Sequence, residues 1–381
     1  MMPPYQSPWM NEALQTFRAA VRTFIQTAFT PRQAHWREAG RPDAEAWIQA
    51  GETGILLTDV PQGYGGGGGT FAHQAVVLEE LARAGVQFGS SIHGLVAQLI
   101  LAYGSEPQKH AWLPRMAQGE LVGAIAMTEP AAGTDLQGIQ TTARRDGDCY
   151  VLNGSKTFIT NAAHAGIVCL AARTDPVAGP RSISLIVVEP KDLPGYRVGS
   201  PLEKVGMHGQ DTCELWFENV RVPAANLLGS VEGRGLSQLM ETMSYERLAI
   251  GVAAVAAAEQ AVVITTKYVK ERTAFGKPLI NLQNTRFKLA ECTAEARIAR
   301  VFLDHCIERF VAGRLDETTT AIAKYWLTDC EGRIVDECVQ LHGGQGYMAA
   351  HPIARMWTDG RVHRIYAGTN EILKELIASS L

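Results

Sequence analysis

One carboxylate in the chain stands in a setting suited to proton removal. Glu246 lies in the segment SYERLAIG, just before the apolar residues Leu248 and Ile250, in a stretch whose pattern predicts a helix. Burial raises the pKa of a carboxyl group, and a base with a pKa near the operating pH can take a weakly acidic proton. A helical glutamate is more often a solvated surface group, so the pattern alone assigns Glu246 no role.

Two loops beside expected strands carry hydroxyl and aromatic groups. In residues 126–138 (AMTEPAAGTDLQG), the hydroxyls of Thr128 and Thr134 and exposed N–H groups could meet a phosphate or a heteroaromatic ring. The segment NGSKTFITNA offers Phe158 as a surface for a ring and Thr160 as its hydrogen-bonding partner. Each segment alone is more typical of an ordinary turn or hairpin.

Two later segments carry groups suited to an anion. In KERTAFGKPLINLQ, Arg272 and Gln283 could form an anion-and-amide clamp, although a solvated helix end is the more usual meaning of such a pattern. In CVQLHGGQGY, Gly343 and Gly344 would let a backbone or a pyrophosphate approach closely. Thr369 would begin the last helix as its N-cap, where anions bind readily.

Helices, then strands, then helices must position these groups. Apolar periodicity predicts helices over residues 9–29, 71–85 and 90–104, and again over 247–272, 282–313, 318–344 and 369–380. Short β-branched runs predict strands at 122–129, 150–160, 166–175, 182–190 and 213–223. The expected fold class is α+β, with an N-terminal helical domain (1–120), a middle β-barrel or sandwich domain (121–232) and a C-terminal four-helix bundle (233–381).

The composition narrows the class of protein. With 381 residues, 46% of them hydrophobic, and a net charge of −4, the chain can bury a core and lacks the basic excess of a general nucleic-acid binder. Its seven cysteines form no CxxC pair and no HExxH motif occurs, so we expect neither a disulfide framework nor a metal site.

Targeting and membrane signals are weak. The first residues lack a basic region followed by an apolar core, so no signal peptide is expected. The most apolar stretch, residues 248–266, is broken by Glu259 and Gln260 and predicts a buried helix, not a membrane span. We expect a cytoplasmic protein.

The glycine run at residues 65–69 lacks the Lys and Ser/Thr of a phosphate-binding loop and predicts a flexible surface turn.

Five motifs together resemble those of the acyl-CoA dehydrogenase family of flavoproteins. The motifs MTEPxAG(S/T)D, NGxKxFITN, ERxAFGKP, QxxGGxGY and IYxGTNEI follow one another in this order across essentially the whole chain. The resemblance implies FAD, held in an extended form between the β-domain and the C-terminal helices and shared across a dimer contact in a homotetramer. It also implies an acyl-CoA substrate and an electron-transfer flavoprotein as acceptor.

The resemblance also assigns roles to individual residues. The implied FAD-binding residues are Met127, Thr128, Thr134, Phe158, Thr160, Arg272, Phe275, Gln283, Gln340, Gly343, Gly344, Thr369 and Glu371. The implied substrate-binding residues are Thr134, Arg247, Ala367 and Gly368.

The catalytic base departs from the commonest family pattern. Many members carry a Glu directly after the Tyr of IYxGT, whereas this chain has Ala367. Long-chain and isovaleryl members carry the base in an ERL segment, which Glu246 matches. The resemblance thus implies that Glu246 takes the α-proton while the β-hydride passes to flavin N5, and that the N–H of Ala367 still binds the thioester oxygen. Glu371 is the rival carboxylate.

The short segments AKYW and CVQLHGG are most similar to those of the long-chain members of the family. Small residues such as Ala249 and Ala367 would leave room for long or branched acyl chains.

Three alternative functions remain open at this point. An oxidase or monooxygenase on the same fold would reoxidise the flavin with O2. The substrate could be an acyl-carrier-protein thioester. A helical scaffold protein that has lost the site would bind no flavin.

Overall fold

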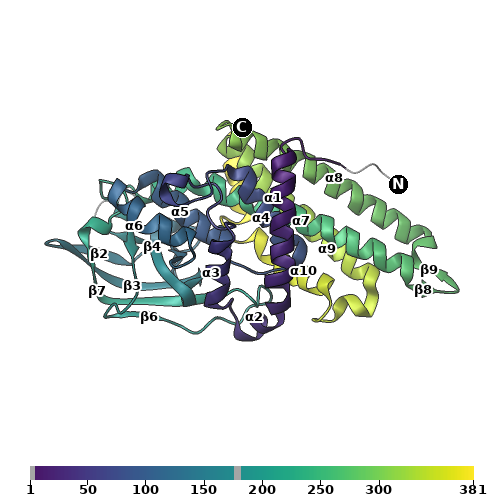
Figure 1. Ribbon diagram of the computed structural model, residues 1–381, viewed down its shortest axis with the longest axis horizontal. Helices are drawn as coiled ribbons and strands as arrows, with labels where there is room; N and C mark the ends of the chain where they lie inside the picture. The colour runs from purple at the N-terminus through teal and green to yellow at the C-terminus, as the bar shows by residue number, and fades with distance from the viewer. Residues whose placement is uncertain (1–4, 176–181) are drawn as a thin grey trace.

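Along the chain, a sheet region lies between an N-terminal and a C-terminal group of helices. The computed structural model describes residues 5–175 and 182–381 (Figure 1). The N-terminal helices are α1 (Glu12–Phe24), α2 (Gln33–Ala39), α3 (Ala44–Glu52), α4 (Phe71–Ala84), α5 (Ser90–Tyr103) and α6 (Glu106–Ala117). The C-terminal helices are α7 (Gly235–Glu271), α8 (Gln283–Val311), α9 (Glu317–His342), α10 (Pro352–Gly360) and α11 (Asn370–Ala378). The predicted α+β class and its order of regions are confirmed.

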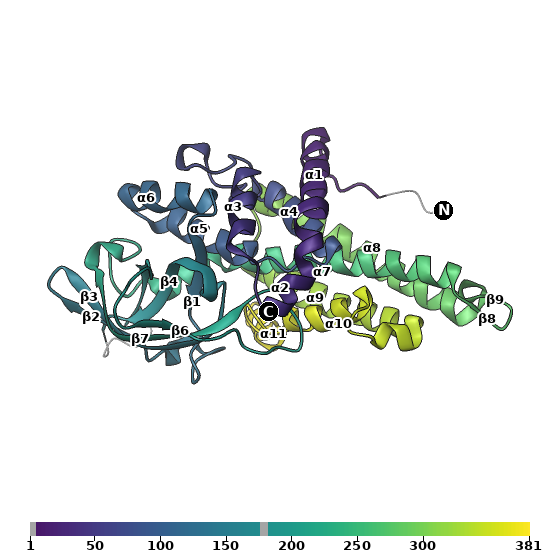
Figure 2. The ribbon, with the colours of Figure 1, turned by 60° about the horizontal axis from the view of Figure 1, so that its bottom comes forward.

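The middle region is a curled sheet. Its strands are β1 (Val122–Ala126), β2 (Thr142–Asp146), β3 (Cys149–Thr160), β4 (Ala165–Arg173), β5 (Ile183–Val188), β6 (Tyr196–Val198) and β7 (Thr212–Pro223). They lie in the order β1-β4-β2-β3-β7-β6, with β5 beside β4. The β1–β4 pair is parallel, while the long β3–β7 pair is antiparallel and shifts register twice. Figure 2 shows the sheet curving below α5 and α6.

Several elements escape the sequence pattern because they are short or interrupted. Helix α6 contains Pro114, and strand β2 buries one side chain, that of Ala143. Helix α7 begins at Gly235, near the start of the predicted C-terminal region at residue 233 and before the regular apolar stretch that starts at Arg247, so it includes Glu246. After α7 the chain forms a small hairpin, β8 (Thr273–Ala274) and β9 (Lys277–Pro278), that no periodicity can reveal.

Helix α7 is the central helix of the C-terminal region. It packs against α8 and α9 of its own region and against α4 and α5 of the N-terminal region. Within the described residues it is the one helix long and apolar enough to cross a membrane, and 61% of its most apolar stretch is buried inside the protein. Packing on several sides explains its Ala- and Val-rich composition, as expected for a buried helix.

The glycine run at residues 65–69 differs from the flexible turn that we expected. Four of its N–H groups donate hydrogen bonds of 2.8–3.3 Å to carbonyl oxygens of residues 57–61. A Cβ atom at Gly66 would lie 2.3 Å from the Val60 oxygen, so the two backbone segments approach too closely for any side chain. The glycines are there for this backbone contact.

We expect Gly66→Ala to destabilise the protein by about 1–3 kcal/mol, because the added methyl group overlaps a backbone carbonyl that cannot move freely. Gly63→Ala is a matched control in the same loop, since a Cβ atom there would meet nothing within 4 Å. Urea unfolding of the two variants measures the difference. Equal loss of stability in both would contradict this explanation of the glycine run.

Candidate active site

A buried lysine fixes the loop that follows β1. The Nζ of Lys156 donates hydrogen bonds to the Met127 carbonyl (2.9 Å) and to Oε1 of Glu129 (2.8 Å). The N–H of Thr157 donates to the Thr128 carbonyl at 2.9 Å. Burial lowers the pKa of Lys156 to about 8, with the Glu129 carboxylate opposing that shift. Met127 and Thr128 are therefore tied to the centre of β3.

The same part of β3 presents Phe158 to the outside. A register shift between Lys156 and Ile159 interrupts its pairing with β7, and Phe158 has a φ of 59° and a 66% exposed side chain. A positive φ in an aromatic residue is strained and marks a segment held by its surroundings. Thr160, two residues later, is half-buried and pairs again with β7. Thr134 is exposed on the loop after β1.

Glu246 lies on α7 with two cations near it. Its side chain is half-buried, and burial raises its pKa to about 7, although the charges of Arg247 and Lys324 act to lower it. The Glu246 charge also acts on Tyr366, whose pKa is raised chiefly by its own burial. Arg247, the next residue on α7, bonds to the Ala367 carbonyl, so this part of α7 lies against the turn that begins at Tyr366, where the resemblance places the commoner family base.

The turn after Tyr366 has an unusual backbone. Ala367 has a φ of 53° and Gly368 a φ of 89°. The Nε of Arg247 donates to the Ala367 carbonyl at 3.4 Å. Within the described residues the N–H of Ala367 donates to no protein acceptor. That N–H is thus available to a carbonyl oxygen brought beside Glu246.

Arg247 is itself a buried cation with donors to spare. Its side chain is 3% exposed, and its Nη1 lies 3.6 Å from Oε1 of Glu317 without forming a hydrogen bond. Burial lowers its pKa, while the Glu317 and Glu246 charges raise it. A buried donor with no acceptor is costly, so this group is suited to bind a polar part of a ligand.

The rival carboxylate stands in a different environment. Glu371 is exposed in the first turn of α11, and its own backbone N–H and the hydroxyl of Thr369 lower its pKa. Thr369 caps that helix, as predicted, by accepting a hydrogen bond from the Ile372 N–H at 3.4 Å. A solvated carboxylate with a lowered pKa is a weak base, which favours Glu246 over Glu371.

A second set of predicted cofactor residues lies at the opposite end of the C-terminal helices. These residues are all exposed, and they are Arg272, Phe275, Gln283, Gln340, Gly343 and Gly344. The hydroxyl of Tyr268 donates to the His342 carbonyl at 3.3 Å, which joins the end of α7 to the end of α9. Figure 1 shows β8 and β9 at this end, away from the sheet.

Phe275 lies beyond the end of helix α7. Helix α7 ends at Glu271, and Phe275 forms the tip of the β8–β9 hairpin with a φ of 52° and a 93% exposed side chain. Because α7 rises about 1.5 Å per residue, Glu246 and Arg272 are roughly 39 Å apart. One chain therefore cannot bring both sets of predicted cofactor residues to the same end of one ligand.

The two sets nevertheless fit a flavin cofactor when each is considered by itself. Phe158 and Phe275 are aromatic side chains without a covering partner in the described chain. A Cβ atom at Gly343 or Gly344 would meet nothing within 4 Å, so their backbone is open to a group approaching from outside. Such glycines let backbone N–H groups reach a pyrophosphate.

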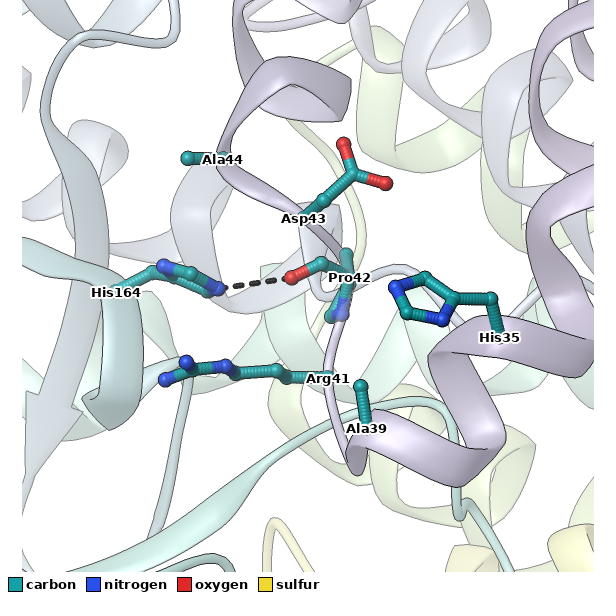
Figure 3. A pocket seen from close by; sticks show the side chains of 7 residues that line it. All are labelled: His35, Ala39, Arg41, Pro42, Asp43, Ala44 and His164. Atoms are coloured by element: carbon teal, nitrogen blue, oxygen red, sulfur yellow. Dashed lines mark hydrogen bonds between the residues drawn. The ribbon is translucent and has the colours of Figure 1, made fainter.

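A separate small cavity of about 260 Å³ lies between the α2–α3 loop and the β3–β4 turn (Figure 3). The Nε2 of His164 lies 2.8 Å from the Pro42 carbonyl and closes one side of it. The residues around it are His35, Ala39, Arg41, Pro42, Asp43, Ala44 and His164. None of them is a predicted site residue, so this cavity is not part of the candidate active site.

Comparison with known proteins shows the family. The chain matches the N-terminal (residues 11–120), middle (124–220) and C-terminal (233–381) domains of acyl-CoA dehydrogenases. It is 43% identical to the mitochondrial long-chain specific acyl-CoA dehydrogenase of Sus scrofa, over 96% of this chain and 85% of that protein. The chain belongs to the acyl-CoA dehydrogenase family.

Solved structures agree with this assignment. An acyl-CoA dehydrogenase from Geobacillus kaustophilus has a TM-score of 0.96 and 45% identity, with 98% of this chain and 99% of that chain covered. A glutaryl-CoA dehydrogenase from Mycobacterium smegmatis in complex with FADH2 has a TM-score of 0.91 and 30% identity, covering 97% and 94%. The cofactor of this family is FAD, and the residues described above fit it.

Lys156 and Lys324 are site residues that the sequence analysis missed. Both side chains are fully buried, and both bond to backbone carbonyls of predicted site loops. Lys324 stands in the apolar segment AIAKYWL, which was an available signal because a buried lysine requires a partner, whereas Lys156 stands between Ser155 and Thr157 and offered none. Their partners lie far away in the sequence, so the pattern could not name them.

Proposed function

We propose that this protein dehydrogenates acyl-CoA thioesters to trans-2-enoyl-CoA, with Glu246 as the base and an electron-transfer flavoprotein as the acceptor. The observation that carries the proposal is the position of Glu246 on α7, next to Arg247, which bonds to the Ala367 carbonyl, and within reach of the charges of Arg247 and Lys324. No carboxylate stands at residue 367 itself, which is Ala367.

The chain's own residues divide the chemistry between them. Ionised Glu246 takes the α-proton, and the free N–H of Ala367 holds the thioester oxygen, where negative charge develops as that proton leaves. Arg247 holds the Ala367 carbonyl and so keeps the N–H in place. FAD, when bound, supplies the acceptor of the β-hydride.

We expect kcat/KM to rise with pH through about pH 7, because Glu246 must be ionised to accept a proton and burial raises its pKa to about 7. Below that pH the carboxyl group is protonated and the rate falls about tenfold per pH unit. Initial rates with a saturating artificial acceptor, measured from pH 5 to 9, give the profile. A flat profile through pH 7 would contradict the assignment of this group as the base.

The substrate and the assembly are further parts of the proposal. The name of the Sus scrofa relative and the small side chains of Ala249 and Ala367 favour long or branched acyl chains. The two ends of α7, roughly 39 Å apart, favour an FAD site completed by the hairpin residues of a second copy, as in the proposed homotetramer. We also propose that the protein is cytoplasmic.

Product analysis tests the reaction. Purified protein is incubated with acyl-CoA of increasing chain length and with electron-transfer flavoprotein. The thioesters are then separated, and their masses are determined by mass spectrometry. We expect a product two mass units lighter than the substrate, formed fastest with long or branched acyl chains. Turnover that needs O2 instead of the flavoprotein would favour the oxidase alternative, and turnover confined to carrier-protein thioesters would change the substrate class.

A further inference from the structure

Lys324 on α9 is a buried cation that the mechanism above does not use. Its side chain is 0% exposed, yet it is one of the two cations that act on Glu246. Its Nζ donates hydrogen bonds to the Gly368 carbonyl (2.8 Å) and to Oδ1 of Asn370 (3.0 Å). A single side chain therefore connects α9 both to the turn that follows Tyr366 and to the start of α11.

Asn370 makes this connection rigid. Its Nδ2 lies within hydrogen-bond distance of the Tyr325 carbonyl (3.2 Å), Oγ1 of Thr328 (3.0 Å) and Oδ1 of Asp329 (3.0 Å). Asn370 is 3% exposed, so these contacts are screened from water. The partner of Lys324 is thus held by one turn of the same helix that carries Lys324.

The turn is held from the opposite side by α7. Arg247 bonds to the Ala367 carbonyl, and Lys324 bonds to the next carbonyl along the chain, that of Gly368. Gly368 lies between the two contacts with a φ of 89°. Its backbone cannot rotate without breaking one of them, so the pair of cations fixes the peptide groups on both sides of Gly368 and thereby restrains Ala367, whose N–H comes just before them.

We propose that Lys324 is a positioning residue of the dehydrogenation, which fixes the Gly368 carbonyl and thereby the Ala367 N–H, and which holds a positive charge beside Glu246. This inference rests on the proposed role of Glu246. It assigns Lys324 two separable effects, one on the geometry of the turn and one on the proton affinity of the base.

The charged and titratable groups that face Glu246 determine the sign of the second effect. They are Arg247 on its own helix, Lys324 on α9 and Tyr366 in the turn. Burial raises the pKa of Glu246, and the two cations oppose that rise. Removing the charge of Lys324 therefore leaves the pKa of Glu246 higher than in the wild type.

Lys324 in turn interacts with four charged groups and with the titratable His363. Arg247 and Glu246 lie on α7, Asp329 lies on α9 itself and Glu371 lies on α11. Burial first, and then the Arg247 charge, lower the pKa of Lys324 to about 8, while the three carboxylates raise it. Lys324 is thus largely charged at pH 7, where the reaction is measured.

One further titratable pair stands at this end of α9. Nδ1 of His363 lies 2.7 Å from Oε2 of Glu331, and both side chains are buried. The ring of His363 stacks on that of Tyr366 with centroids 5.7 Å apart. This pair supports Tyr366 and is left unchanged by the variants below.

The test compares Lys324→Met with Lys324→Arg in the FAD-loaded enzyme. In Lys324→Met we expect kcat to fall about 10- to 100-fold with little change in KM, because the N–H is no longer fixed. We also expect the acidic limb of the kcat/KM profile to move to higher pH by about 0.5–1 unit. Lys324→Arg keeps the charge, so the acidic limb of its kcat/KM profile should stay near the wild-type position even if the larger side chain lowers the rate.

Lys109→Met is the matched control, because Lys109 lies on α6 and pairs there with Glu106, whose side chain is exposed. Its rate and pH profile should equal those of the wild type. FAD content, measured by absorption, separates a loss of cofactor from a loss of rate. An acidic limb that stays in place in Lys324→Met, or that moves equally in Lys324→Arg, would overturn the electrostatic part of the proposal.

A second variant keeps the proposal testable if Lys324→Met does not fold. Asn370→Ala removes one acceptor of Lys324 and leaves its charge, so kcat should fall while the acidic limb stays in place. An unchanged kcat in Asn370→Ala would overturn the positioning role. A wild-type enzyme that dehydrogenates no acyl-CoA would overturn the proposed function itself, which the same series of assays shows first.

Discussion

Replacing Glu246 with Gln is expected to lower kcat by about 10²- to 10⁴-fold, the range that a general base contributes. Gln has the shape of Glu but cannot accept the α-proton. The half-buried site should accommodate it, because the change removes a charge from an environment that already disfavours one. FAD content and thermal stability should therefore remain near the wild-type values.

Exchange of the α-hydrogen with solvent gives a direct measurement of this step. In D2O the wild type should incorporate deuterium at the α-carbon of a bound acyl-CoA, and Glu246→Gln should not. Glu371→Gln is the informative comparison, because Glu371 is the other carboxylate near the turn and is solvated. Exchange that survives Glu246→Gln and stops in Glu371→Gln would reverse the assignment of the base.

The second large effect concerns stability and cofactor binding. Lys156→Met should destabilise the protein by about 3 kcal/mol, because it leaves Glu129 buried without its cation. Glu129 still accepts hydrogen bonds from the N–H groups of Gln140 and Thr141, which keeps the loss near the lower end of the usual range. The Met127 carbonyl is also released, so FAD should bind roughly tenfold more weakly.

Urea unfolding and FAD titration measure these two losses separately. The double variant Lys156→Met with Glu129→Gln should recover about 1 kcal/mol of stability, because the unpaired charge is gone. It should not recover FAD affinity, since the Met127 carbonyl still lacks the hydrogen bond from Lys156. If the double variant loses as much unfolding free energy as the two single variants lose together, a direct pairing of Lys156 with Glu129 is contradicted.

The sequence predicted those features that depend on neighbours along the chain. Periodicity located α7 and the main strands, and the apolar residues after Glu246 correctly indicated that its environment would disfavour charge. The interruption of the apolar stretch of α7 by Glu259 and Gln260 predicted a buried helix, and 61% of its most apolar stretch is buried inside the protein. These features follow from local patterns, which a helix or a strand turns directly into a buried face.

Other features depend on contacts between distant segments, and no local pattern contains them. Lys324 reaches Gly368, which lies 44 residues further along the chain, because α9 and the start of α11 pack together. Phe158 turns outward because β3 and β7 shift register, not because its own residues form a turn signal. The hairpin at Phe275 consists of two-residue strands, which are too short to show alternation.

The central claim is that this chain oxidises an acyl-CoA with its own FAD and with Glu246 as the base. The most direct test mixes the purified flavoprotein with palmitoyl-CoA in the absence of oxygen and follows the visible absorption of the flavin. We expect rapid bleaching in the wild type and none in Glu246→Gln at equal FAD content. A flavin that stays oxidised with palmitoyl-CoA and with short and branched acyl-CoA, or that bleaches equally in both proteins, would contradict it.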